Sequence, residues 1–350
     1  MNDLVRELSA LPWSVLLTLG MLLVALVLYA VLGGADYGGG VWDLLASGPR
    51  AGEQRRLIEG AIGPVWEANH VWLIFMIVLL FTAFPHAFAA LSTALHIPLT
   101  LMLLGIVLRG TSFTFRQYHR QDDPVQQRWG RLFAISSVFT PVMLGICIGA
   151  ISTGSIRVQD GTVTSGFLRP WLGLFPFAVG LFAVALFAFL AAVYLTVEAT
   201  DEALREDFRR RALAAAVATG ALALTVYLLS YETAPLVRVG LTHRPWSWPL
   251  HIITGLFALG TIGALWRRRF QLARVLAVGQ IGLILGGWAL SLYPFLVPPD
   301  ISIIQAAAPL SVLRPVLWGT ALGLLILVPS FLYLFRVFKG GTAFSQTDEK

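Results

Sequence analysis

The chain has 350 residues, of which 57% are hydrophobic and 13% are charged, and its mean hydropathy is +0.76. Soluble domains carry roughly 25% charged residues, so this composition excludes an ordinary water-soluble globular protein. The net charge of +6 does not indicate a nucleic-acid-binding protein, because the basic residues lie between apolar runs and form no single stripe. We therefore expect an integral membrane protein that binds no nucleic acid.

Nine apolar runs are each long enough to cross a bilayer as a helix, which needs about 20 residues. They cover residues 13–33, 64–84, 90–109, 131–151, 171–197, 212–231, 249–266, 274–293 and 312–337. We therefore predict an all-α, polytopic transmembrane helix bundle that forms a single integral membrane domain over residues 1–350. A short uncharged segment around Pro85 separates the second and third runs, which predicts a tight antiparallel hairpin. The first run is too long for the apolar part of a signal peptide, so we expect no cleavable one.

Lysine and arginine are distributed unequally over the connections between the runs. Connections one, three, five and seven, together with the C-terminal tail, hold 19 of the 25 basic residues, and the other connections and the N-terminus hold six. Cytoplasmic loops of membrane proteins are enriched in lysine and arginine. This alternation predicts nine spans with the N-terminus outside and the C-terminus inside.

A glycine-rich stretch with one carboxylate, GGADYGGGVWD over residues 33–43, follows the first run. It is not a phosphate-binding loop, because no Gly-Lys-Ser/Thr follows it and no strand precedes it. We expect the glycines to form an irregular or tightly packed exit from the first span, which places Asp36 at the edge of the hydrocarbon. An ionisable side chain there is a functional candidate, although Asp36 could simply cap or hydrogen-bond the next element.

A second polar stretch, GPVWEANHVW over residues 63–72, begins the second run. Pro64 suits a first helical turn, and Glu67 could merely complement the helix dipole. However, Glu67 and His70 are three residues apart on one helical face and can meet, with Trp66 and Asn69 beside them. Because polar groups in the membrane are costly, we favour a functional role for this cluster.

Arg109 closes the third run and allows two interpretations. Its guanidinium group could snorkel to the inner headgroups. It could also pair with Asp36 or Glu67, which the predicted topology places on the same side of the membrane.

Histidine and cysteine give little support for a metal or haem site. His70 and His96 differ in predicted depth by roughly 15 Å, so they cannot share one iron. His96 and His251 could lie closer, but no ligand spacing supports that pair, and neither H-E-x-x-H nor a Cys/His cluster is present. Cys147 is the only cysteine, which excludes C-x-x-C-H haem attachment. We expect neither metal nor stoichiometric haem in this chain.

These motifs resemble those of subunit II of cytochrome bd-type quinol oxidases. Residues 34–38 resemble the family's G-x-D-x-G end of the first helix, and residues 63–72 resemble its P-x-W-[DE]-x-N-[QH]-V-W start of the second. Residues 109–116 resemble its R-x-x-x-F-x-[FY]-R exit from the third helix. Residues 293–295 and 306–309 resemble the region before the last helix. Together with the nine spans, the resemblance covers essentially the whole chain.

The resemblance implies a haem-free subunit in the bacterial cytoplasmic (inner) membrane, packed against subunit I. In this family subunit I carries haem b and haem d, and the complex oxidises quinol and reduces O2 to water without pumping protons. Some members hold a structural quinone, and small single-helix accessory subunits and membrane lipid are further expected partners. The resemblance implies no catalytic residue in this chain. It does imply a role in the cytoplasmic proton path or in haem-pocket support for Asp36, Trp66, Glu67 and His70, with Arg109 as a charge partner.

Two other functions fit parts of the pattern. A proton-coupled secondary transporter also uses membrane carboxylates and interrupted helices, but paired broken helices in corresponding halves are not evident. A purely structural assembly subunit without a role in proton transfer is the other alternative.

Overall fold

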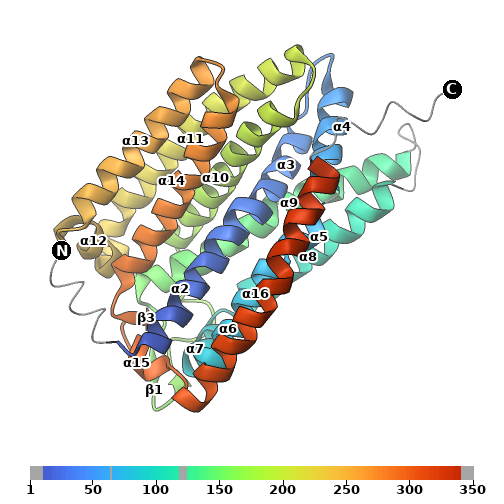
Figure 1. The fold of residues 1–350 in the computed structure, drawn as a ribbon. Coiled ribbons are helices and arrows are strands. Elements are labelled where there is room, and N and C mark those ends of the chain that lie inside the picture. Colours follow the sequence, from blue (N-terminus) through green and yellow to red (C-terminus); the bar gives the residue numbers. More distant parts are fainter. Residues whose placement is uncertain (1–10, 64, 118–123, 340–350) are drawn as a thin grey trace.

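The computed structural model describes residues 11–63, 65–117 and 124–339. In this part of the chain, nine helices are long and apolar enough to cross a membrane, and they stand side by side in one elongated bundle (Figure 1). They are Trp13–Leu44, Trp66–Ala83, His96–Arg116, Pro124–Thr153, Leu174–Glu198, Glu202–Thr233, Ser247–Trp266, Phe270–Leu292 and Leu310–Leu334. The prediction of a polytopic transmembrane helix bundle is confirmed.

The first span is longer than predicted and runs without a break from Trp13 to Leu44. It consists of α2 (Trp13–Leu28), a π-helical turn η1 (Tyr29–Gly33) and α3 (Gly34–Leu44). The span therefore does not end at residue 33 as predicted, and Asp36 lies within a helix, whereas the expected tight packing of the glycines is present. The glycines serve close packing, because a Cβ atom on Gly38 would overlap with the backbone carbonyl of Phe187 on a neighbouring helix.

The second and third spans are not joined by a tight hairpin, which corrects a second prediction. The second span comprises α5 (Trp66–Asn69) and α6 (Val71–Ala83), and a separate helix α7 (Pro85–Ala94) follows it before α8 (His96–Gln117) begins. Pro85 begins α7 because a proline fits the first turn of a helix. The third span therefore starts six residues later than predicted, and Arg109 lies inside α8 instead of closing it.

The remaining elements follow in chain order. They are α9 (Pro124–Thr153), β1 (Val158–Gln159), β2 (Thr162–Val163), α10 (Leu174–Glu198), α11 (Glu202–Thr233), α12 (Pro235–His243), α13 (Ser247–Trp266), α14 (Phe270–Leu292), β3 (Phe295–Val297), β4 (Ile301–Ser302), α15 (Ile303–Ala306) and α16 (Leu310–Lys339). The fourth and sixth spans start earlier than the predicted residues 131 and 212, because α9 and α11 extend beyond the apolar runs into polar sequence.

Helix α10 lies at the centre of the bundle and α16 at its surface (Figure 1). In the most apolar window of α10, 67% of the residues are buried, whereas none are buried in that of α16. Helix α10 packs against α3 and α9 on one side and against α11 on the other, so it joins the earlier helices of the chain to the later ones. Glycine and alanine make this packing close: Gly145 on α9 faces the backbone of Gly180 on α10.

Different structures cover the two ends of the bundle. A short helix, α4 (Ala51–Ile62), lies at one end, where Arg50 forms a double hydrogen bond with Asp207 of α11 at 2.9 and 2.6 Å. At the other end lie α7, α12, α15 and two antiparallel hairpins, β1–β2 and β3–β4 (Figure 1). Arg157 and Asp300 tie these two hairpins together. The α4 end carries the arginine-rich connections, and its orientation towards the cytoplasm stays a prediction from this charge distribution.

Candidate functional site

Asp36 lies in the interior of the bundle, on the first turn of α3. Its side chain is 5% exposed, and the Asn69 amide nitrogen donates a hydrogen bond of 2.7 Å to its Oδ2 atom. Asn69 comes from α5, so this contact connects the first two spans. The π-helical turn η1 directly precedes α3, and single π-helical turns within α-helices are frequent at functional sites.

Two buried tyrosines lie beside this carboxylate. The hydroxyl oxygens of Tyr29 and Tyr37 are 3.2 Å apart, and both side chains are essentially inaccessible. The ring of His70 lies 6.0 Å from each tyrosine ring, measured between centroids. Hydroxyl groups and an imidazole therefore line the space between α3 and the start of α6.

Arg109 is buried in the same cluster, with 1% of its surface exposed. Its Nε atom donates a 3.2 Å hydrogen bond to the Ser137 hydroxyl, and its guanidinium carbon lies 4.8 Å from the centre of the Tyr37 ring. Snorkelling to the headgroups is therefore wrong for Arg109. A charge at this depth is expensive and marks a functional candidate. We call Asp36, Tyr29, Tyr37, Asn69, His70 and Arg109 the Asp36 cluster.

Trp66 forms one wall of the cluster. Its ring lies 6.2 Å from that of His70 and 5.9 Å from that of Phe113 on α8. Gly110 allows this approach, because a Cβ atom there would lie only 3.1 Å from the Trp66 ring. Trp66 therefore positions His70 between α5 and α8.

Glu67 does not join the cluster. Its side chain is exposed, and among the described residues it forms no side-chain hydrogen bond or ion pair. The anticipated meeting of Glu67 and His70 does not occur, because α5 has only four residues and His70 turns towards the tyrosines before α6 begins. In this chain alone, Glu67 faces outwards.

Several residues of this region were missed at the level of sequence. Sequence reasoning noted Asn69 only as a neighbour and gave no role to Tyr29 or Tyr37. It also missed the buried ion pair between Asp43 of α3 and Arg116 of α8, whose atoms approach to 3.0 Å. The spacing contained a signal: Asp43 follows Asp36 by seven residues, so both fall on one face of a continuous helix.

The histidines that could have shared an iron have other partners. The Nδ1 atom of His96 is 2.9 Å from the Thr93 carbonyl, and Nε2 of His251 is 2.8 Å from the Leu241 carbonyl. Both side chains are exposed. Over the described ranges, no three His, Cys, Asp or Glu residues are placed to hold a metal ion.

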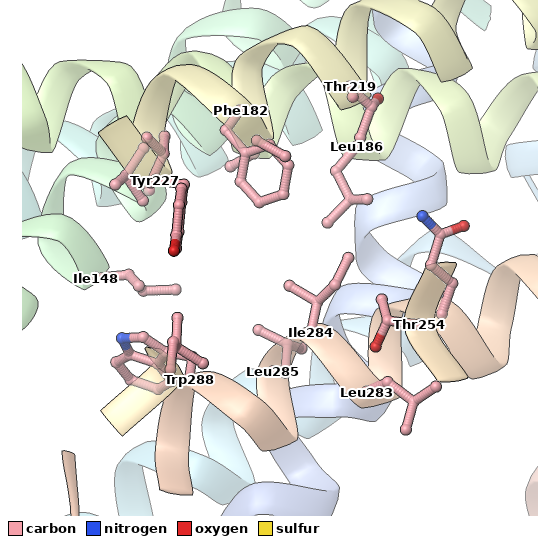
Figure 2. A pocket seen from close by; sticks show the side chains of 18 of the residues that line it. Ile148, Phe182, Leu186, Thr219, Tyr227, Thr254, Leu283, Ile284, Leu285 and Trp288 are labelled. Atoms are coloured by element: carbon pink, nitrogen blue, oxygen red, sulfur yellow. The ribbon is translucent and has the colours of Figure 1, made fainter. Parts of the chain in front are cut away.

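A cavity of about 750 Å³ lies mainly between α10, α11, α13 and α14, and residues of α2, η1, α9 and α12 complete its lining. Figure 2 shows its apolar lining, which includes Phe182, Leu186 and Ile284. Two polar atoms in the lining, the Thr219 hydroxyl oxygen and Gln280 Oε1, are buried without a hydrogen-bond partner within the described structure. Cavities of this size commonly hold small molecules, and the unpartnered atoms could bind one polar group.

The chain is similar to known oxidase subunits along most of its length. Residues 14–338 match the family model for cytochrome bd terminal oxidase subunit II. A Bacillus subtilis (strain 168) protein provisionally named cytochrome bd menaquinol oxidase subunit II is 21% identical over 333 residues, covering 92% of this chain and 94% of that protein. The cytochrome bd-I ubiquinol oxidase subunit 2 of Escherichia coli (strain K12) is 26% identical over 190 residues, which are 53% of this chain and 48% of that protein.

A solved structure shares the fold. The structure of bd oxidase from Geobacillus thermodenitrificans matches with a TM-score of 0.78 and 23% identity, covering 93% of this chain and 99% of the matched one. The family model, which spans nearly the whole sequence, and this common fold agree with the motifs at residues 34–38 and 63–72. The chain belongs to the family of cytochrome bd terminal oxidase subunit II.

Proposed function

We propose that the Asp36 cluster is part of the path that carries protons from the cytoplasm to the haems of the partner subunit. As subunit II of a cytochrome bd quinol oxidase, the chain is part of an oxidoreductase complex and a multi-pass protein of the bacterial inner membrane. Membership of this family implies that the haems belong to subunit I. The observation that carries the proposal is a buried carboxylate, Asp36, held by an amide inside a membrane helix.

The chemistry of the cluster suits proton transfer. Reduction of O2 consumes protons, and a buried site needs protonatable groups along the way. The Asp36 carboxyl group can take up and release a proton while the Asn69 amide holds its Oδ2 atom in place. The Tyr29 and Tyr37 hydroxyls offer a donor and an acceptor next to it. Arg109 contributes a fixed positive charge that offsets a negative one in the same cluster.

Glu67 lies outside the Asp36 cluster and continues the proposed path at the surface of this chain. Because its side chain is exposed on this chain, we place it at the surface that subunit I covers, where it continues the path between the subunits. His70 and Trp66 then form the wall that separates Asp36 from this surface and support the haem-bearing side of the interface. Accessory single-helix subunits and bound lipid remain predictions from the family.

The test is the Asp36→Asn variant of the purified complex. It keeps the size of the side chain and removes the titrating group, so quinol-driven O2 consumption should fall by about tenfold or more, the scale of a lost proton-transfer group. Haem content, measured from the visible spectrum, should stay normal. Glu67→Gln should slow turnover less, because Glu67 lies outside the cluster.

Glu53→Gln on α4 is the matched control, since it removes one exposed carboxylate and should leave turnover unchanged. Normal turnover of an Asp36→Asn complex with full haem content would overturn the proposal. If the variant instead loses haem, then Asp36→Glu decides the matter. That variant restores the carboxyl group, and full recovery of turnover by it supports proton transfer.

We also propose that the cavity between α10, α11, α13 and α14 holds the structural quinone found in some members of the family. The residues fit such a molecule: the apolar lining suits an isoprenoid chain, the Thr219 hydroxyl can donate to a quinone carbonyl, and Gln280 Oε1 can accept from a quinol hydroxyl. The quinone would be permanently bound, and its polar ring would supply hydrogen-bond partners for the two unpartnered atoms.

Filling the cavity tests this assignment. Gly220 lines the cavity and a Cβ atom there meets nothing within 4 Å, so Gly220→Leu should occupy the space without distorting α11. Extracted quinone per complex should fall at least about twofold, as expected when a well-formed pocket is filled. Gly263→Leu on α13 is the control, since Gly263 is equally open but lies outside the cavity. Unchanged quinone in Gly220→Leu, or phospholipid in its place, would contradict the assignment.

A further inference from the structure

The Asp36 cluster has a second layer closer to the α4 end of the bundle. On α3, Asp43 follows Asp36 by seven residues, and on α8, Arg116 follows Arg109 by the same number. Seven residues are about two helical turns, or about 10.5 Å along the axis. Each helix therefore presents the same type of charged side chain twice on one face.

Helix α9 lies against both layers. The ring of Phe133 is 5.2 Å from the Arg109 guanidinium carbon and 6.0 Å from that of Arg116. Between the layers, Ser137 packs against Gly40 of α3 and accepts the hydrogen bond from Arg109. The two layers are thus consecutive parts of one interface between α3, α8 and α9.

The second layer connects a buried carboxylate with a partly exposed one. Arg116 Nη1 lies 3.0 Å from Asp43 Oδ1, and both side chains are at most 5% exposed. Arg116 Nη2 lies 3.8 Å from Glu59 on α4, whose side chain is 27% exposed. One guanidinium group therefore joins a carboxylate in the interior to a carboxylate that water reaches.

Stability alone does not account for this arrangement. A buried ion pair is on average no more stabilising than apolar side chains of similar volume, because both charges must leave water. The Arg116 Nε atom is also buried without a hydrogen-bond partner in the described structure. An ion pair kept at such a cost beside a functional cluster indicates a function of its own.

We propose that Glu59 and Asp43 form the cytoplasmic entrance for protons on their way to Asp36, with Arg116 as the positioning residue between them. Glu59 takes a proton from cytoplasmic water, the proton passes through water to the Asp43 carboxylate, and Asp43 returns to its ionised form by giving it up towards Asp36. Arg116 keeps its proton throughout and shifts its contact to whichever carboxylate is charged. This inference rests on the proposed role of Asp36.

Other charged groups face this entrance and have to be left unchanged in the test. On α4, Arg55 lies near Asp43. On α11, the Arg211 guanidinium carbon lies 5.4 Å from the Trp42 ring, next to Asp43 in sequence, and Arg211 donates to the Leu45 carbonyl. Arg116 itself contacts both carboxylates, Asp43 at 3.0 Å and Glu59 at 3.8 Å.

The experiment measures proton uptake during a single turnover of the reduced, purified complex with O2, using a pH-sensitive dye. Glu59→Gln should slow the proton-uptake phase by at least about threefold and Asp43→Asn by about tenfold or more, as for lost proton-transfer groups. Initial O2 binding to the haem should keep its rate. Glu59→Asp should restore uptake, and Glu53→Gln, which removes a charge from the same helix, should leave it unchanged.

The outcomes separate this inference from the proposed function. If Asp36→Asn slows uptake while Glu59→Gln and a fully assembled Asp43→Asn do not, the entrance assignment is wrong and the role of Asp36 stands. If Asp36→Asn itself shows normal proton uptake, both the entrance assignment and the proposed role of Asp36 are contradicted. Should Asp43→Asn fail to assemble, Glu59→Gln decides, because its partly exposed side chain can be changed without leaving an empty space in the interior.

Discussion

Only glycine at position 38 lets α3 approach α10 as closely as it does. A Cβ atom on Gly38 would overlap with the backbone carbonyl of Phe187, and the backbone of a central helix cannot move aside cheaply. Overpacking of this kind typically costs 1–3 kcal/mol. The glycine-rich motif is thus a packing surface that brings Asp36 into the interior of the bundle.

Gly38→Ala should therefore lower the free energy of unfolding by about 1–3 kcal/mol. Thermal denaturation of the purified complex, followed by loss of the haem spectrum, would show a lower midpoint temperature. Gly60→Ala on α4 is the matched substitution, since its Cβ atom meets nothing within 4 Å, and it should leave the midpoint unchanged or slightly raised. Equal midpoints for the two variants would contradict the packing argument.

Asn69 positions Asp36, so replacing Asn69 should change turnover through its effect on the Asp36 carboxylate. Asn69→Leu keeps the approximate volume but deletes the 2.7 Å hydrogen bond to Asp36, and bonds to charged groups contribute about 1.5–3 kcal/mol. Turnover of the assembled complex should fall, whereas Asn69→Leu combined with Asp36→Asn should be no slower than Asp36→Asn alone. Additive losses in that double variant would show that Asn69 acts independently of Asp36.

Among the elements, the two hairpins at the end opposite α4 are joined by an ion pair. Asp300, next to β4, accepts hydrogen bonds from Arg157 at 2.8 and 3.0 Å and from the backbone of Val158 at 2.8 Å. The hydrogen bond with Arg157 lowers the pKa of the Asp300 carboxyl below its ordinary value. Because this pKa is lowered in the folded state, the contact stabilises the hairpins above the unfolded pKa and is lost as the pH falls through the folded one.

We expect the hydrogen-exchange protection factors of residues 157–164 to be independent of pH between about 5 and 8, since an ordinary aspartate titrates near 3.9. Asp300→Asn should lower them across this whole range, and acidification below the folded pKa should lower them in the wild type. Protection that changes in the wild type between pH 5 and 8 would mean that a different group controls this end.

For the whole molecule, the charge distribution predicts the orientation in the membrane. With Cys147 replaced by alanine, a cysteine placed at exposed Thr162 should react with a membrane-impermeant maleimide in intact spheroplasts. One placed at exposed Glu53 on α4 should react only after permeabilisation. The positive-inside rule is the reason, because the α4 end carries most of the arginines. The reverse labelling pattern would overturn the predicted topology.

The division of cofactors between the subunits is also a property of the whole complex. Because the family implies that the haems belong to subunit I, replacing either His96 or His251 by alanine should leave all haem bands of the complex in place; one ring nitrogen of each lies at hydrogen-bond distance from a backbone carbonyl. Absorption spectra of the oxidised and reduced complex provide the measurement. Loss of one band, with the subunit still assembled, would identify a haem ligand in this chain.

The sequence alone determined the membrane location, the number of spans and their alternating charge, because these follow from composition and from runs of apolar residues. It also singled out Asp36, Trp66, His70 and Arg109, since polar side chains are conspicuous where the surroundings must be apolar. Tertiary structure decided where the helices end and which side chains meet. The first span continues through its glycines because α10 packs on them, and no local pattern reports a neighbour about 150 residues away in the chain.

Tertiary packing also decided which residues belong to the Asp36 cluster. Asn69, Tyr29 and Tyr37 look like ordinary helical residues until the π-helical turn and α5 place them around Asp36. Glu67 has the residue type and the motif position of a site residue, yet a four-residue helix turns it outwards. The spacing of Asp43 and Arg116 was visible in the sequence, but their pairing depends on the packing of α3 and α8 around α9. Residue chemistry is local, whereas the contacts that give it a function are fixed by the packing of distant helices.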